Sequence, residues 1–254
     1  MLKRVHGELR NLNWRPARPN PFRKMLPPGK RKTIVPVQIE PMDIGKVGIW
    51  DQGQLGSCTA HGTGFLWAYQ YFVEHQMPVM PSRLFIYYCE RMIENDIDQD
   101  NGAIVADGLD ALLTYGVPNE SDWPYDISQF ATKPPALCWA NGLQFKGLEK
   151  NGVNLDVDSL RSALQYGLPV TFGFTVFESF MSDSWMKSGM MPVPESGEEI
   201  DGGHCVAFVG DEPKENAFWV RNSWGADWCQ SGRFLFPYDC LKIASDGWTL
   251  PKVS

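Results

Sequence analysis

An apolar stripe at helical spacing follows Gly56 and predicts a long, mostly buried helix that begins near Ser57. The stripe consists of Phe65, Leu66, Tyr69, Phe72 and Val73. Two further helical patterns cover about residues 82–94 and 106–115. The second is followed by Gly116, which suits the left-handed turn that often terminates a helix. We therefore expect the first half of the chain to be mainly helical.

Beyond about residue 165 the apolar pattern changes to that of β-strands. The segments that fit are 168–176, 204–209, 217–221 and 233–236. A helical half followed by an antiparallel β half predicts an α+β fold with two lobes. We place the helical lobe at residues 34–150 and the β lobe at 151–254. No apolar run approaches the roughly 20 residues that span a bilayer, so we expect no membrane contact.

The first 33 residues differ from the rest in charge and composition. They contain ten Lys or Arg and one acidic residue, Glu8, whereas the remainder contains 13 basic and 29 acidic residues. They are rich in Pro, Arg and Asn and show no helical or strand period, so we interpret residues 1–33 as an extended basic leader or propeptide. Such a leader is expected to dock onto the acidic body as an autoinhibitory strap, or to contact a polyanion such as a nucleotide. A solvated basic tail is the alternative.

The six cysteines form no CxxC pair and no Cys/His cluster with the spacing of a zinc site. We therefore expect no metal and no organic cofactor. One free nucleophile would leave five cysteines, which excludes a complete set of disulfides within one chain. The open question is whether any pair is bridged among Cys89, Cys138, Cys205, Cys229 and Cys240. The first residues lack the apolar stretch of a secretory signal, so we expect a reducing compartment, either the cytoplasm or a virion. We expect the protein to be a monomer.

Cys58 stands where the main helix is predicted to begin. The unpaired N–H groups and the dipole of a helix N-terminus favour the thiolate form of a thiol whose ordinary pKa is about 8.5. Gly56 leaves room for a substrate backbone to approach. Upstream, the Gln52 amide and the Cys58 N–H together could stabilise an oxyanion. From this segment alone, Cys58 could equally be a small buried hydrophobic residue.

A thiolate nucleophile needs an imidazole within hydrogen-bond reach and a third group to hold that ring. Of the four histidines, His6 lies in the leader and His75 near the far end of the helix. His61 would point back along its own helical turn, so we interpret it as a packing or solvent-facing residue. His204 opens an apolar strand after two glycines, the second of which is Gly203. By elimination, His204 is the candidate general base.

Three segments carry this chemistry in order along the chain. They are Asp51–Ala60 around Cys58, Gly202–Ala207 around His204, and Asn222–Gly225 with Trp228 and Gly232 after it. Together they resemble the active-site blocks of the papain family of cysteine peptidases, which includes the cathepsins. The blocks have the family's order and comparable gaps, and the resemblance covers about residues 34–250. A chance match of one block is plausible, but three in register is not.

The resemblance implies a papain-like two-lobe fold, in which a central helix starts at the nucleophile and the second lobe is an antiparallel, barrel-like β structure. It implies hydrolysis of peptide or protein substrates by the Cys58 thiolate, with His204 as the proton carrier. The Asn222 carbonyl would hold the imidazole, and Trp224 would shield that bond from water. Gln52 would supply the oxyanion-hole amide. The expected activity is that of a thiol protease.

The resemblance also implies where a substrate would lie. Gly102 falls where the family's glycine loop pairs with the substrate backbone, and Pro169 begins a strand that contributes to the wall of the S2 pocket. With Gly56, Gly203 and Trp224, Gly102 completes the set of candidate substrate-binding residues.

Several departures from the family pattern are visible. Leu55 stands where papain and the cathepsins usually carry a disulfide cysteine, and Asp100 occupies roughly its partner's place. Two glycines replace the acidic residue before the histidine, and the leader is shorter than the usual helical propeptide. The Leu55 form is more similar to bacterial, phage or viral members. Two alternatives stay open: a Cys-His transamidase or acyltransferase, and a catalytically silent binding module with this fold.

Overall fold

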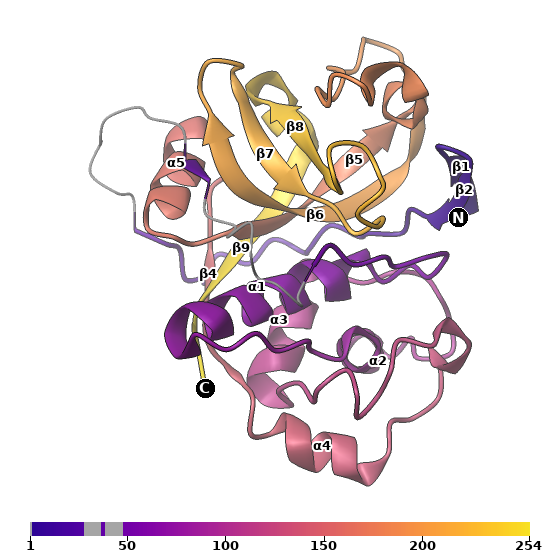
Figure 1. Ribbon diagram of the computed structural model, residues 1–254, viewed down its shortest axis with the longest axis vertical. Coiled ribbons are helices and arrows are strands. Elements are labelled where there is room, and N and C mark those ends of the chain that lie inside the picture. Colours follow the sequence, from indigo (N-terminus) through magenta and orange to yellow (C-terminus); the bar gives the residue numbers. More distant parts are fainter. Residues whose placement is uncertain (1, 28–36, 39–47) are drawn as a thin grey trace.

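In the computed structural model the described residues are 2–27, 37–38 and 48–254. The helices are α1 Cys58–His75, α2 Arg83–Ile93, α3 Val105–Thr114, α4 Ala136–Gly142 and α5 Val157–Gln165. The strands are β1 Leu2–Val5, β2 Glu8–Asn11, β3 Val37–Gln38, β4 Gly147–Gly152, β5 Val170–Phe177, β6 Ile200–Glu212, β7 Ala217–Arg221, β8 Arg233–Pro237 and β9 Ala244–Val253. Figure 1 shows helices α1–α4 on one side of the molecule and most of the sheet on the other, with the N-terminal segment running between them.

The predicted long helix is confirmed as α1, which is central to the fold. Its first 14 residues are buried, because the sheet covers one side of the helix and α2 and α3 cover others. Glycines permit this close packing. A Cβ on Gly62 would lie 3.1 Å from the Cys205 sulfur, and one on Gly64 would lie 3.1 Å from Cδ1 of Ile86. The helix ends at Gln76, which adopts the left-handed conformation.

The other two predicted helices are confirmed as α2 and α3. The Ser82 hydroxyl accepts a hydrogen bond from the backbone N–H of Phe85 and so caps the start of α2. Gly116, with φ of 67°, terminates α3 as its position predicted. No helix within the described residues is long and apolar enough to cross a bilayer.

The sheet runs in the order β4-β9-β5-β6-β7-β8 with antiparallel pairing throughout, and β3 pairs with the far end of β6. The four predicted strands are present as β5, β6, β7 and β8. Phenylalanines fill the core beneath them, and the rings of Phe172 and Phe208 are stacked with their centroids 3.8 Å apart. In the described part of the chain the terminal strands β4 and β8 do not pair with each other, so the sheet is open and no closed barrel forms.

Outside the leader, the strands β3, β4 and β9 and the helices α4 and α5 escaped prediction. The sequence of β4 is largely polar, and β9 contains Gly247 and Pro251, so neither shows a clear alternating pattern. They are strands because β4 pairs with β9 and β9 also pairs with β5. The predicted lobe boundary at residues 150 and 151 falls inside β4, and β9 also packs against α1. The C-terminal strand therefore contributes to the core of the helical side.

The first part of the leader is a β-hairpin, although we predicted an extended segment without strands. β1 and β2 pair over four residues each and are joined by His6 and Gly7, which both have positive φ. Two such residues form the tight turn that matches the twist of paired strands. Strands this short show too few residues for a period to be visible. The predicted end of the leader, at residue 33, lies outside the described residues.

Candidate active site

The predicted catalytic residues come from three separate elements. Cys58 is the first residue of α1, His204 lies in β6, and Asn222 directly follows β7. Because β6 and β7 pair with Ala207 opposite Arg221, the two strands place His204 and Asn222 at the same end of the sheet. Cys58 and His204 have no solvent exposure at all.

The hydrogen bond between His204 and Asn222 determines which nitrogen of the imidazole ring carries the proton. His204 Nε2 lies 2.7 Å from the side-chain oxygen of Asn222, which also accepts the backbone N–H of Ser223 at 2.8 Å. An amide oxygen only accepts, so Nε2–H donates, and Nδ1 of the neutral ring keeps its lone pair. Nδ1 is buried and has no hydrogen-bond partner among the described residues. It is therefore positioned to receive a proton.

The Trp224 ring covers the imidazole of His204. The two rings are stacked with centroids 4.6 Å apart and an angle of 25° between their planes. Trp224 is itself buried and packs edge-on against Trp228. This cover excludes water from the His204–Asn222 hydrogen bond, and a hydrogen bond in a dry environment holds its geometry better.

Gln52 is buried in the loop before α1, and its side chain is held at both ends. Its oxygen accepts the Ser223 hydroxyl at 2.6 Å, and its nitrogen donates to the backbone oxygen of Leu55 at 2.9 Å. The second bond fixes which end of the amide is the nitrogen, because a backbone carbonyl oxygen can only accept. An amide nitrogen carries two hydrogens, so one N–H of Gln52 remains for a substrate oxygen.

Burial keeps both Cys58 and His204 neutral in this structure. Desolvation raises the pKa of Cys58 to about 12, although backbone groups of Cys205, Thr59 and Cys58 lower it. Desolvation lowers the pKa of His204 to about 4; the Asn222 hydrogen bond opposes this shift and the nearby positive charge of Arg10 adds to it. At neutral pH Cys58 is therefore a thiol and His204 an uncharged imidazole.

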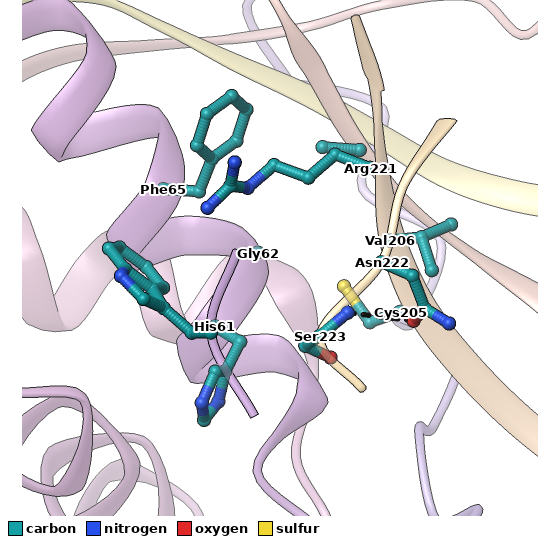
Figure 2. A pocket seen from close by; sticks show the side chains of 10 residues that line it. His61, Gly62, Phe65, Cys205, Val206, Arg221, Asn222 and Ser223 are labelled. Atoms are coloured by element: carbon teal, nitrogen blue, oxygen red, sulfur yellow. Dashed lines mark hydrogen bonds between the residues drawn. The ribbon is translucent and has the colours of Figure 1, made fainter. Parts of the chain in front are cut away.

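His61 is a packing residue and is not solvent-facing. Its Nδ1–H donates to the backbone oxygen of Ser57 at 3.0 Å, and its ring packs edge-on against Tyr125. Desolvation lowers the pKa of His61 well below its usual value. Figure 2 shows its ring directed away from Cys205 and Asn222, beside the small cavity between α1 and the sheet.

Asp100 fastens the loop before the nucleophile to the loop that follows α2. Its carboxylate accepts the backbone N–H of Gly56 at 2.9 Å and the hydroxyl of Tyr87 at 2.6 Å. Leu55 is buried in the helical core beside this junction. All six cysteines are free thiols. Hydrogen bonds to Asp100 thus join the two loops that a disulfide would join in papain and the cathepsins.

The leader fills the groove that leads to these residues. The Trp14 N–H donates to the oxygen of Gly203 at 3.2 Å, and the Arg15 N–H donates to the oxygen of Ala103 at 3.2 Å. Asn13 lies so close to Gly102 that a Cβ there would collide with its backbone oxygen. Residues 12–15 are therefore held by Gly203, the chain neighbour of His204, on one side of the groove and by Ala103 on the other. Figure 1 shows the N-terminal segment running between the helical side and the sheet.

Ion pairs hold the leader to the acidic body. Five basic leader residues pair with carboxylates of the body: Lys3–Asp201, Arg10–Asp51, Arg15–Glu94, Arg23–Asp246 and Lys24–Glu149. The ring of His6 also hydrogen-bonds to Asp183. Arg10 is almost completely buried and also lies over the Trp224 ring. The charge asymmetry of the sequence thus indicated the docking, but no signal in the sequence indicated that Asn13 and Trp14 would occupy the groove.

Comparison with known proteins identifies the family. Residues 40–241 match the family described as papain family cysteine protease. The chain belongs to this family. The predicted papain-like fold and thiol protease class are thereby confirmed.

Relatives of this papain-family protease include viral and bacterial proteins, as the Leu55 departure predicted. An uncharacterised peptidase C1-like protein of Acanthamoeba polyphaga mimivirus is 39% identical over 216 residues, which are 80% of this chain and 70% of that protein. The crystal structure of xylellain, a cysteine protease from Xylella fastidiosa, superposes with a TM-score of 0.89 at 30% identity and full coverage of both chains. A viral cathepsin of Choristoneura fumiferana nuclear polyhedrosis virus is 24% identical over 78% of this chain and 58% of that protein.

Proposed function

We propose that this papain-family protease hydrolyses peptide bonds through Cys58, His204 and Asn222, by way of a thioester acyl-enzyme. The observation that carries the proposal is the hydrogen bond from His204 to the Asn222 oxygen, because it leaves Nδ1 as the proton acceptor. The Cys58 thiol gives its proton to Nδ1, and its sulfur bonds to the carbonyl carbon of the substrate. The carbon–nitrogen bond then breaks, and the proton on His204 passes to the leaving amine. Water, deprotonated by His204, releases the acid and restores the thiol.

The proposal includes the leader as an inhibitor of the same site. Residues 12–15 lie in the groove, so a substrate cannot enter while they are bound. The leader also affects the ionisation of Cys58 and His204, because it buries both side chains and because Arg10 lowers the pKa of His204. When the leader leaves, water returns to the groove and Arg10 departs. Both changes favour the thiolate–imidazolium pair on which nucleophilic attack depends.

The test uses the full chain with a specific cleavage site in the exposed leader segment 18–22. The intact protein is folded, cut and diluted, then offered a fluorogenic peptide and an epoxide inhibitor that alkylates thiolates. We expect peptide hydrolysis, and one inhibitor per chain attached to Cys58. A folded, cut chain that neither hydrolyses any peptide nor reacts with the epoxide would contradict the proposal. Aminolysis without hydrolysis would favour the transamidase alternative.

Gln52→Glu tests the oxyanion role with little change of shape. Glutamate can still accept the Ser223 hydroxyl, but it has no N–H to donate to the developing oxyanion. We expect kcat to fall by about 100- to 1000-fold, which is the usual effect of losing one such donor. Gln165→Glu on α5 makes the same chemical change outside the site and should leave kcat within about twofold. An unchanged kcat for Gln52→Glu would remove Gln52 from the mechanism.

A further inference from the structure

We infer that Asp51, Gly53 and Trp224 form a guanidinium-binding site, and that this site selects substrates with an arginine after the scissile bond. In the intact chain the leader's own Arg10 occupies the site. The inference rests on the proposed function, because it assigns a charge specificity to the leaving-group side of the same groove.

The guanidinium of Arg10 meets acceptors at both of its terminal nitrogens. Nη1 donates to the Asp51 carboxylate and to the backbone oxygen of Gly53 at 3.3 Å. Nη2 donates to the backbone oxygen of Trp224 at 3.4 Å, and the guanidinium lies over the Trp224 ring, 5.8 Å from its centroid. Only 4% of the Arg10 side chain is exposed. These contacts are therefore made in a nearly dry environment, where hydrogen bonds to a charge are strong.

The body of the protein holds these acceptors in place by itself. Asp51 Oδ1 accepts the backbone N–H of Gly53 at 2.8 Å, which fixes the direction of the carboxylate. The backbones of Asp51 and Trp224 form an antiparallel β-bridge, so the two sides of the site keep their spacing. The leader adds one acceptor of its own, Glu8, whose side chain is 66% exposed. When the leader leaves, the site stays formed and the Asp51 carboxylate needs a new cationic partner.

The geometry of the site favours arginine over lysine. A guanidinium is planar and carries N–H groups on two separate terminal nitrogens, one for Asp51 and one for the Trp224 oxygen. A lysine ammonium has a single nitrogen, so it can pair with Asp51 while losing the second contact. The flat guanidinium also packs better over an aromatic ring. We therefore expect arginine to bind best, lysine less well, and an uncharged side chain least.

The site lies beside the groups that carry the proposed reaction. Asp51 precedes Gln52, the proposed oxyanion donor, and the Trp224 ring is stacked on the imidazole of His204. That imidazole protonates the leaving amine, so the part of the substrate that follows the scissile bond lies nearest to Trp224. An arginine in this part of the substrate has the same acceptors within reach as Arg10. The rival explanation is that the site serves only to anchor the leader.

The experiment again uses the full chain, folded, cut within residues 18–22 and diluted. Internally quenched peptides that span the scissile bond carry arginine, lysine or alanine at one position after it at a time. At one of these positions we expect kcat/KM for arginine to exceed that for alanine about tenfold, with lysine between them. This is the lower end of the effect of a hydrogen bond between charged groups, because Asp51 is about half exposed.

Asp51→Asn removes the charge and keeps an oxygen that can accept the Gly53 N–H. The ratio of kcat/KM for the arginine peptide over the alanine peptide should fall to about twofold. Asp126→Asn is the matched control. The Asp126 carboxylate makes the same turn by accepting the backbone N–H of Ser128 at 3.0 Å, but it is exposed and caps the short 3-10 helix Ile127–Gln129. This variant should keep the wild-type ratio.

A binding measurement separates this inference from the proposed catalysis. A synthetic peptide of leader residues 8–16 is titrated into the cut chain carrying Cys58→Ala, and a second peptide carries Arg10→Ala. We expect the second to bind about tenfold more weakly, and adding Asp51→Asn to the chain should remove most of that difference. A chain that showed this difference but hydrolysed no peptide would contradict the proposed function and support the guanidinium site.

Three results would each overturn the inference. They are equal binding of the two peptides, a cut chain that hydrolyses peptides without preferring arginine after the scissile bond, and an arginine advantage that survives Asp51→Asn.

Discussion

Replacing Cys58 by alanine should lower kcat for peptide hydrolysis by about a millionfold once the leader has been cut, because alanine has no atom that can form the acyl-enzyme. The residue opens α1, and its side chain lies beside the backbone of Cys205, the neighbour of His204. Without the nucleophile, the oxyanion hole and the binding groove alone retain a small acceleration over water. The measurement is single-turnover hydrolysis of a fluorogenic peptide at a high concentration of the cut chain.

The control for this substitution is Cys229→Ala. Cys229 is also a free thiol, is only partly buried, and lies outside the three catalytic elements. It should retain activity within about threefold. If Cys58→Ala kept more than about a hundredth of the activity while Cys229→Ala behaved normally, the nucleophile would have to be another group. His204→Ala should lose about as much as Cys58→Ala, since residues that act as one unit show non-additive losses.

Cutting the leader should raise activity on the order of a hundredfold relative to the intact chain. A conformational equilibrium that moves from about 1:99 to 99:1 in favour of the open groove gives an increase of this size. The ion pairs predict that salt assists, because screening weakens contacts such as Lys3–Asp201 that are partly exposed. After the cut the freed leader competes as a separate molecule, so activity should rise further on dilution.

Lys24→Ala is the matched control for the leader effect. Lys24 pairs with Glu149, but Lys24 is exposed, Glu149 is partly exposed, and the pair lies outside the groove. The pair is expected to contribute little, so this variant should stay as inactive as the intact wild type. An intact chain that hydrolysed peptides as fast as the cut one, at equal concentration and in low salt, would rule out inhibition by the leader.

The sequence alone predicted those parts of the site that depend on residues close together in the chain. Cys58 with its helix, His204 with its strand and Asn222 with its following tryptophan each lie within a short recognisable segment. In the structure, hydrogen bonds join Ser223 to Gln52 and His204 to Asn222. The net charges of the leader and the body were also sufficient to predict contact between them.

Other features depend on interactions between distant residues and could not be predicted. β9 is a strand because β4 and β5 pair with it, in spite of Gly247 and Pro251. The path of the leader depends on hydrogen bonds to the backbone of Ala103 and Gly203. Every residue has such backbone groups, so the sequence does not mark the two that bind the leader.

The carboxylate junction at Asp100 has a practical consequence. Reagents that keep a nucleophilic thiol reduced also reduce disulfide bonds. An enzyme that needs a free thiol for activity and a disulfide for stability therefore cannot be given the best conditions for both. In this protein the two requirements are independent, because oxygen and nitrogen atoms make the connection. Strong reductants such as dithiothreitol can therefore be used freely during purification and assay without loosening the segment that presents the reacting atom.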